Sequence, residues 1–140
     1  MSIILLLLRL PILVVHILFG LFTIFFFPKE PKNFKSSHYK IMMLWMNILS
    51  SILGIKVDIR GIPDQSANLF VSNHVTYLDI IIINKLLPVN FIAKEEISSW
   101  PVIGRLASKT GTLFIKRGDN VESSKMIYEM EERFKLKNKI

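Results

Sequence analysis

The first third of the chain constrains the fold more than any other part. Residues 3–27 are almost unbroken apolar sequence, interrupted by Arg9, Pro11 and His16. As an α-helix this run is roughly 37 Å long, enough to cross a hydrocarbon core of about 30 Å. A cleaved signal peptide is the alternative, but it needs a shorter apolar core and a small-residue cleavage site, whereas this run ends in three phenylalanines and a proline. The run therefore predicts a retained transmembrane or interfacial helix.

A lysine-rich stretch follows the apolar run. Lys29, Lys32, Lys35 and Lys40 lie within twelve positions, in a chain whose formal net charge is +7. Basic flanks of membrane segments lie on the cytoplasmic side and are attracted to anionic lipids. We therefore expect the chain at a membrane, with everything after this flank on the cytoplasmic side of what would be a bacterial inner membrane.

A second apolar stretch spans residues 41–55 and is short for a membrane span. We interpret it as a helix at the membrane interface, packed against the first segment. An ordinary core helix of the globular part is the alternative. With the first interpretation, residues 1–55 form a helical, membrane-anchoring segment and residues 56–140 form a separate globular part.

From Lys56 onward, short apolar or alternating runs alternate with helical patterns. Strands are predicted over 56–60, 68–72, 90–93 and 112–115, and helices over 77–87, 97–108 and 121–135. In the last helix Ile127, Met130 and Phe134 recur at helical spacing. Alternation of this kind predicts an α/β layer arrangement with a mostly parallel sheet.

Composition excludes several kinds of site. The chain has no Cys, so disulfides, thiolate metal sites and thiol nucleophiles are ruled out, and only three His are present. We therefore expect no metal. We also expect no nucleic-acid partner, because the lysines concentrate beside the apolar run and at the C-terminus instead of interleaving with aromatic residues.

The segment Ser72-Asn73-His74-Val75-Thr76-Tyr77-Leu78-Asp79 carries the clearest chemical signal. It lies at a predicted strand-to-helix junction, where α/β sheets present their working residues. Residues five apart on one helix point about 140° away from each other. His74 must therefore lie in the loop and fold back over the helix start, so that the Asp79 carboxylate accepts one ring N–H and leaves the other nitrogen as a base. The alternative is structural: Thr76 and Asp79 fit a capping box, in which Asp79 only starts the helix.

Two blocks of sequence, and the connector between them, resemble the glycerolipid acyltransferases, in particular the 1-acylglycerol-3-phosphate acyltransferase family. The first block is Asn73-His74-x4-Asp79, similar to the family's His-x4-Asp signature. The second is Gly111-Thr112-Leu113-Phe114-Ile115-Lys116-Arg117, and the connector Ala93-Lys94-Glu95-Glu96, with Pro101 and Gly104, lies between them. The resemblance covers about residues 54–120.

One block of the family is missing from the sequence. The family has a third block, similar to Phe-Pro-Glu-Gly-Thr-Arg, after the helix predicted to end near Lys135, and no Pro-Glu-Gly occurs in this chain. We therefore expect residues 56–140 to be the N-terminal part of an incomplete acyltransferase domain with an exposed sheet edge. The activity of this chain in isolation is then in doubt.

The resemblance implies transfer of an acyl group to the sn-2 hydroxyl of 1-acylglycerol 3-phosphate, giving phosphatidic acid. The donor would be a thioester, either acyl-CoA or acylated acyl carrier protein. His74 would be the general base and Asp79 its orienting partner. Arg117 would bind the acceptor phosphate, with Asn73 and Gly111 also at the substrate site. No cofactor is implied. Arg117 as a solvated strand-end residue is the alternative reading of that position.

Two other functions remain open from the sequence. The chain could be an inactive, truncated homologue or another non-enzymatic membrane protein. It could also keep the chemistry and use a different acceptor, such as a lyso-ornithine lipid.

Overall fold

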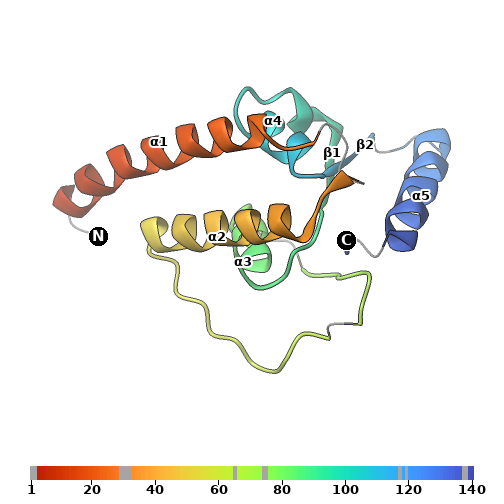
Figure 1. Ribbon diagram of the computed structural model, residues 1–140, viewed down its shortest axis with the longest axis horizontal. Coiled ribbons are helices and arrows are strands. Elements are labelled where there is room, and N and C mark those ends of the chain that lie inside the picture. Colours follow the sequence, from red (N-terminus) through yellow and green to blue (C-terminus); the bar gives the residue numbers. More distant parts are fainter. Residues whose placement is uncertain are drawn as a thin grey trace.

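Helices dominate the computed structural model (Figure 1), which describes residues 3–28, 33–64, 66–73, 76–116, 118, 120–136 and 139–140. The elements along the chain are α1 (Ile3–Phe25), α2 (Ser36–Leu53), α3 (Leu78–Leu86), β1 (Ile92–Lys94), the 3-10 helix η2 (Glu95–Ser99), α4 (Ile103–Lys109), β2 (Leu113–Ile115) and α5 (Asn120–Lys135).

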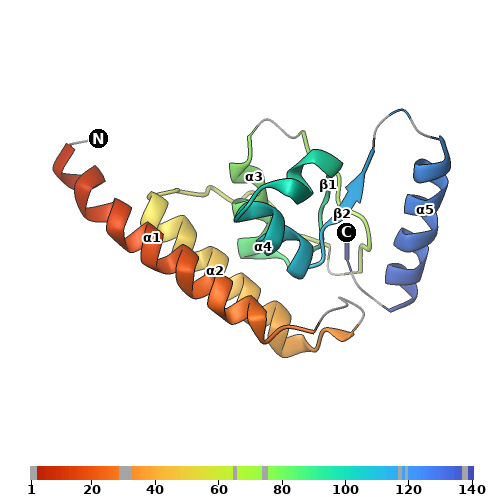
Figure 2. The same ribbon diagram turned by 90° about the horizontal axis from the view of Figure 1, so that it is seen from above.

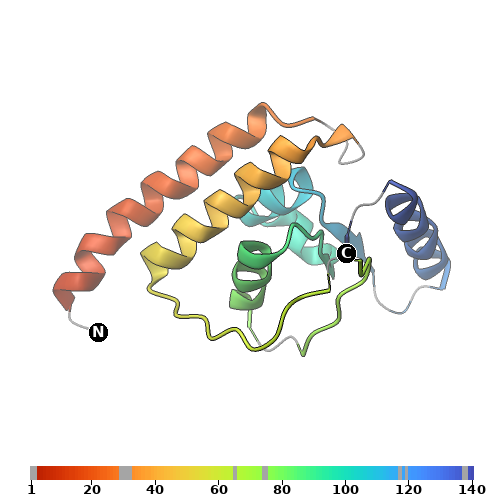
Figure 3. The ribbon, with the colours of Figure 1, turned by 60° about the horizontal axis from the view of Figure 1, so that its bottom comes forward.

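Helices α1 and α2 form an antiparallel hairpin, seen side by side in Figures 2 and 3. Midway along the hairpin the His16 and Trp45 rings stack with centroids 4.5 Å apart. The Trp45 indole N–H donates to the His16 carbonyl (3.3 Å), and His16 Nε2 lies 3.1 Å from the Trp45 carbonyl. Gly20 permits this approach, because a Cβ there would lie 2.7–2.9 Å from the Trp45 ring. The expected packing of the second apolar helix against the first is confirmed, although α2 begins at Ser36, before the predicted start.

Helix α1 keeps most of its apolar surface exposed. Within the described part of the chain one helix, over Leu7–Phe25, is long and apolar enough to cross a membrane, with a mean hydropathy of 2.2. Only 17% of that window is buried within the protein. A core helix of a soluble protein would be mostly covered by the rest of the protein, and α1 is not.

The sheet is short and parallel. Strands β1 and β2 pair with Ile92 opposite Leu113, and an isolated parallel bridge joins Val89 to Lys139. Ile140 extends this pattern, since its N–H donates to the Asn68 carbonyl and its carbonyl accepts from the Phe70 N–H. Four extended segments therefore lie in the order 68–70, 139–140, 89–94, 113–115. The expectation of parallel pairing is confirmed for the described strands.

Two of the four predicted strands do not form as expected. Residues 68–72 are extended and bonded to Ile140 but form no regular strand, and residues 56–60 form none. In the latter segment Ile59 is 53% exposed, and Arg60 donates to the Asp58 carboxylate (3.2 Å) at the surface. The apolar residues of this alternating segment do not pack on a core, so the predicted strand at 56–60 is wrong.

The core lies between α5 and the sheet. Leu113, Met126 and Ile140 are buried together, with Ile115, Met130 and Phe134 packed around them. Figure 2 shows α5 on one side of the strands, with α3, α4 and the hairpin on the other. The predicted apolar stripe of α5 is correct for Met130 and Phe134 but not for Ile127, which is 58% exposed because Met126 fills the core position instead.

Candidate active site

Of the described residues that the sequence singles out, Asn73, Asp79 and Lys94 lie at the carboxyl edge of the sheet, whereas Gly111 does not. In a parallel sheet the carboxyl ends of all strands lie at the same edge, which is where α/β proteins place ligands. Asn73 follows the extended segment 68–72, Lys94 ends β1, and Lys116 follows β2. Helix α3 starts at this edge, toward the top of Figure 2, with Asp79 in its first turn.

His74 and Arg117, the predicted base and phosphate ligand, lie outside the described residues. The structure describes their neighbours, Asn73 and Thr76 on either side of the first and Lys116 and Gly118 on either side of the second. Their assigned roles therefore stay predictions that rest on the sequence.

Asp79 caps α3. Its Oδ2 accepts the Thr76 backbone N–H (3.3 Å), and the Thr76 hydroxyl accepts the Leu78 N–H (3.2 Å). Tyr77 already has helical backbone angles (φ −64°, ψ −12°), so Thr76 occupies the cap position and Asp79 the third helical position. The capping interpretation is confirmed. Capping does not prevent Asp79 from accepting a second hydrogen bond, such as one from the His74 ring, because a carboxylate has two oxygens with about four acceptor positions in all.

The other two predicted substrate residues lie in different surroundings. Asn73 is exposed beside the start of α3. Gly111 lies at the opposite end of β2 from Lys116, buried in the turn after α4. Its φ of +96° favours glycine, and a Cβ there would come within 2.5 Å of Asn90 Nδ2. The structure thus gives Gly111 a part in the turn, and its contact with a substrate stays a prediction.

Arg133 is a half-buried charge that the sequence did not reveal. This α5 residue donates from Nη1 to the Gly111 carbonyl at 2.6 Å, and partial burial lowers the pKa of its guanidinium while Glu129 and Tyr39 act in the opposite direction. Asn90, in the same cluster, donates to the Thr110 carbonyl (3.0 Å). The sequence feature that could have identified Arg133 is its position between Met130 and Phe134, on the face of α5 that packs against the core. Its contacts hold α5 to the turn that leads into β2.

An aromatic pair borders the site. The rings of Tyr77 and Trp100 lie 5.9 Å apart, and both side chains are exposed. Tyr77 stands two residues before Asp79, and Trp100 stands between η2 and α4. This apolar rim connects the start of α3 with α4, which in turn packs on α1.

Among the described residues, no group of three His, Asp or Glu side chains is close enough together to hold a metal ion. Among the described residues, the polar groups at this edge are the Asp79 carboxylate, the Asn73 amide and the ammonium groups of Lys94 and Lys116. Such a set can orient a base and attract an anion.

Comparison with known proteins identifies the family. The Acyltransferase family model matches residues 55–140. The lyso-ornithine lipid O-acyltransferase of Pseudomonas aeruginosa is 40% identical over 74 residues, which are 53% of this chain and 29% of that relative. The lyso-ornithine lipid O-acyltransferase of Rhodobacter capsulatus is 43% identical over 70 residues, 50% of this chain and 25% of that relative.

A relative that is named for a different substrate has a similar identity. The 1-acyl-sn-glycerol-3-phosphate acyltransferase of Neisseria gonorrhoeae is 38% identical over 85 residues, 59% of this chain and 33% of that relative. The match thus spans a third or less of each of these relatives. No solved structure matches the chain. The family model covers the whole globular part, including both blocks that carry the resemblance, and the chain therefore belongs to the glycerolipid acyltransferase family.

Proposed function

We propose that this protein transfers a fatty acyl group from a thioester to the hydroxyl of a lysolipid at a membrane. The observation that carries the proposal is the Asp79 carboxylate, which is fixed by the Thr76 amide at the carboxyl edge of a parallel sheet. It occupies the acidic position of the His-x4-Asp block, within the part of the chain that matches the family.

In the proposed reaction His74 removes the proton of the acceptor hydroxyl as its oxygen attacks the thioester carbonyl. Asp79 accepts the other ring N–H, fixes the tautomer and stabilises the imidazolium that forms. The thiolate leaves without needing much acid assistance, because thiol pKa values are near about 8.5. The proton passes from the imidazolium to the departing thiolate or to solvent. General-base assistance of this kind contributes roughly 10²–10⁴ in rate.

The preferred acceptor is 1-acylglycerol 3-phosphate, with the phosphate bound by Arg117 and acyl-CoA or acyl carrier protein as the donor carrier. Lys94 and Lys116, at the carboxyl ends of β1 and β2, would add positive charge on the same edge. A lyso-ornithine lipid is the second candidate, because the Pseudomonas and Rhodobacter relatives named for that acceptor match at 40–43% identity.

The exposed apolar face of α1 supports a membrane location for this chemistry. A lysolipid acceptor resides in the bilayer, so a site next to a membrane helix receives it without full extraction into water. The side of the membrane on which the site lies follows from the lysine-rich flank and is part of the proposal.

The test uses full-length protein in detergent, with His74→Ala as the variant. Acyl-CoA and acyl carrier protein thioesters are each paired with 1-acylglycerol 3-phosphate and with lyso-ornithine lipid, and the acylated product is quantified. We expect His74→Ala to abolish transfer while flotation with vesicles shows unchanged membrane association. Turnover like wild type in this variant would refute the catalytic assignment, and the acceptor that is consumed decides between the two substrates.

A further inference from the structure

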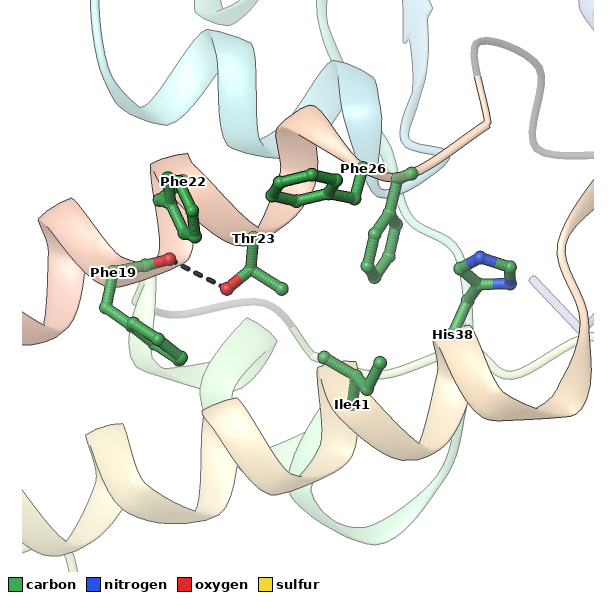
Figure 4. Close-up of a pocket in the computed structure, with 7 residues that line it drawn as sticks. Phe19, Phe22, Thr23, Phe26, His38 and Ile41 are labelled. Atoms are coloured by element: carbon green, nitrogen blue, oxygen red, sulfur yellow. Dashed lines mark hydrogen bonds between the residues drawn. The ribbon is translucent and has the colours of Figure 1, made fainter.

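A groove lies between α1 and α2, well away from the sheet. It encloses roughly 180 Å³ and is open to the surroundings. Figure 4 shows its lining, in which side chains from the last turns of α1 face side chains from the first turns of α2. The lining residues are Phe19, Phe22, Thr23, Phe26, Phe27, His38 and Ile41.

The walls of this α1–α2 groove are apolar and largely uncovered by the protein. Phe22 is 63% exposed and Phe26 is 68% exposed, with their rings in contact edge to face at 5.2 Å. Phe27 is buried at one end of the groove, where it meets the His38 ring at 4.9 Å. Aromatic area of this extent is seldom left to water in a stable protein, so it calls for an apolar occupant.

One end of the groove is polar and basic. His38 Nδ1 accepts the Lys35 backbone N–H at 2.8 Å, so the neutral ring carries its proton on Nε2 as a donor. Lys35 and Lys40 are exposed in the stretch of chain that carries His38. Residues 33–40 contain these two lysines and no acidic residue, so this stretch has a net positive charge.

An apolar slot with a cationic end matches an amphiphile that has a hydrocarbon chain and a negative headgroup. We propose that the groove binds one acyl chain of an anionic phospholipid from the surrounding bilayer, with the lipid phosphate near Lys35 and His38. Charge complementarity argues for an anionic lipid over a neutral one, and the open side lets the rest of the chain continue into the membrane.

This lipid would be bound, not transformed. The joined ends of α1 and α2, whose side chains line the groove, lie toward the bottom of Figure 2, whereas α3 starts toward the top. The inference requires α1 to lie in lipid but does not depend on the chemistry assigned to His74 and Asp79. The bound lipid would hold the hairpin in the bilayer and fix the position of the catalytic edge relative to it.

The test is lipid titration of the full-length protein in mild detergent, followed by native mass spectrometry. Phosphatidylglycerol and phosphatidylcholine with the same acyl chains are the two probes. We expect one retained phosphatidylglycerol per protein and clearly weaker retention of phosphatidylcholine. Equal retention of the two lipids would overturn the proposed anionic specificity.

Variants that fill the groove test its location. Thr23→Phe or Ile41→Phe should weaken phosphatidylglycerol binding about fifteenfold or more, because the added ring displaces at least two methylene groups and each changes the equilibrium roughly fourfold. Val15→Phe is the matched control, since Val15 is exposed on α1 and is not part of the lining. Unchanged binding in the filled variants, or equal loss in the control, would overturn the site.

Two further variants keep the test decisive. If a filled variant loses its helical circular dichroism, Lys35→Gln combined with His38→Gln replaces it, and this pair should weaken phosphatidylglycerol binding but leave phosphatidylcholine binding unchanged. His74→Ala should bind the lipid like wild type. That result separates this proposal from the proposed acyl transfer, because either one can fail while the other stands.

Discussion

Substitutions at Thr76 and Asp79 separate the capping role of Asp79 from its proposed catalytic role. The two residues share one arrangement at the start of α3, in which each side chain accepts a backbone N–H. Loss of either acceptor should therefore cost similar stability. Only the loss of the Asp79 carboxylate should affect acyl transfer.

The magnitudes follow from the geometry. The two bonds are 3.3 and 3.2 Å long and exposed, so Thr76→Ala and Asp79→Ala should each cost about 0.5–1 kcal/mol, the lower part of the range for helix caps. For a domain of this size that is a fall in Tm of roughly 2–5 °C. Acyl transfer should stay within about threefold of wild type in Thr76→Ala but fall on the order of 10²–10⁴ in Asp79→Ala.

Asp79→Asn is the sharper variant. An asparagine oxygen still accepts the Thr76 N–H, so Tm should stay within about 1–2 °C of wild type, whereas the missing charge should remove most of the activity. Thermal unfolding by circular dichroism and turnover of the thioester are measured on the same preparations. If activity in all three variants tracks Tm, Asp79 is only a cap and the catalytic reasoning fails.

Three other substitutions test separate parts of the structure. Gly20→Ala should destabilise the hairpin by about 1–3 kcal/mol in denaturant titrations, since the new Cβ would overlap the Trp45 ring, and Trp45→Leu should relieve part of that cost; an additive double variant would contradict the contact. Arg133→Met should cost about 2–3 kcal/mol in thermal unfolding, because it leaves the Gly111 carbonyl without its charged donor, and a loss below about 0.5 kcal/mol would show that the bond contributes little. Arg117→Ala should raise KM for the phosphorylated acceptor roughly tenfold or more and leave KM for the thioester nearly unchanged; equal effects on both would count against phosphate binding.

Sequence periodicity predicted two of the three helices of the globular part, but the helix predicted over 97–108 is divided into η2 and α4, with residues 100–102 between them. The helix predicted over 121–135 corresponds to α5, because sixteen residues give the 3.6-residue period enough turns to be visible. The five residues of 56–60 offer too little pattern to tell a strand from an extended surface segment. Which of Met126 and Ile127 enters the core depended on where the sheet lies, which local periodicity does not specify.

The positions of Asn73 and Asp79 were predictable, because they depend on local chain order. Asn73 and Asp79 lie at a junction between an extended segment and a helix, and the Thr76 spacing indicated the cap. The roles of Gly111 and Arg133 were not predictable, because they arise from the approach of α5 to a turn about twenty residues away in sequence. Contacts of that kind are set by packing and leave no fixed spacing.

The pairing of Ile140 with Asn68 and Phe70 has a consequence for folding kinetics. These backbone partners lie about seventy positions apart in sequence, so their bonds close a long loop and can form only after the intervening chain has ordered. Asn73 follows that pairing directly. We therefore expect hydrogen-exchange protection to develop early in α1, α2 and α5 and last around residues 68–73. The carboxyl edge of the sheet, where the candidate site lies, would then form at the end of folding.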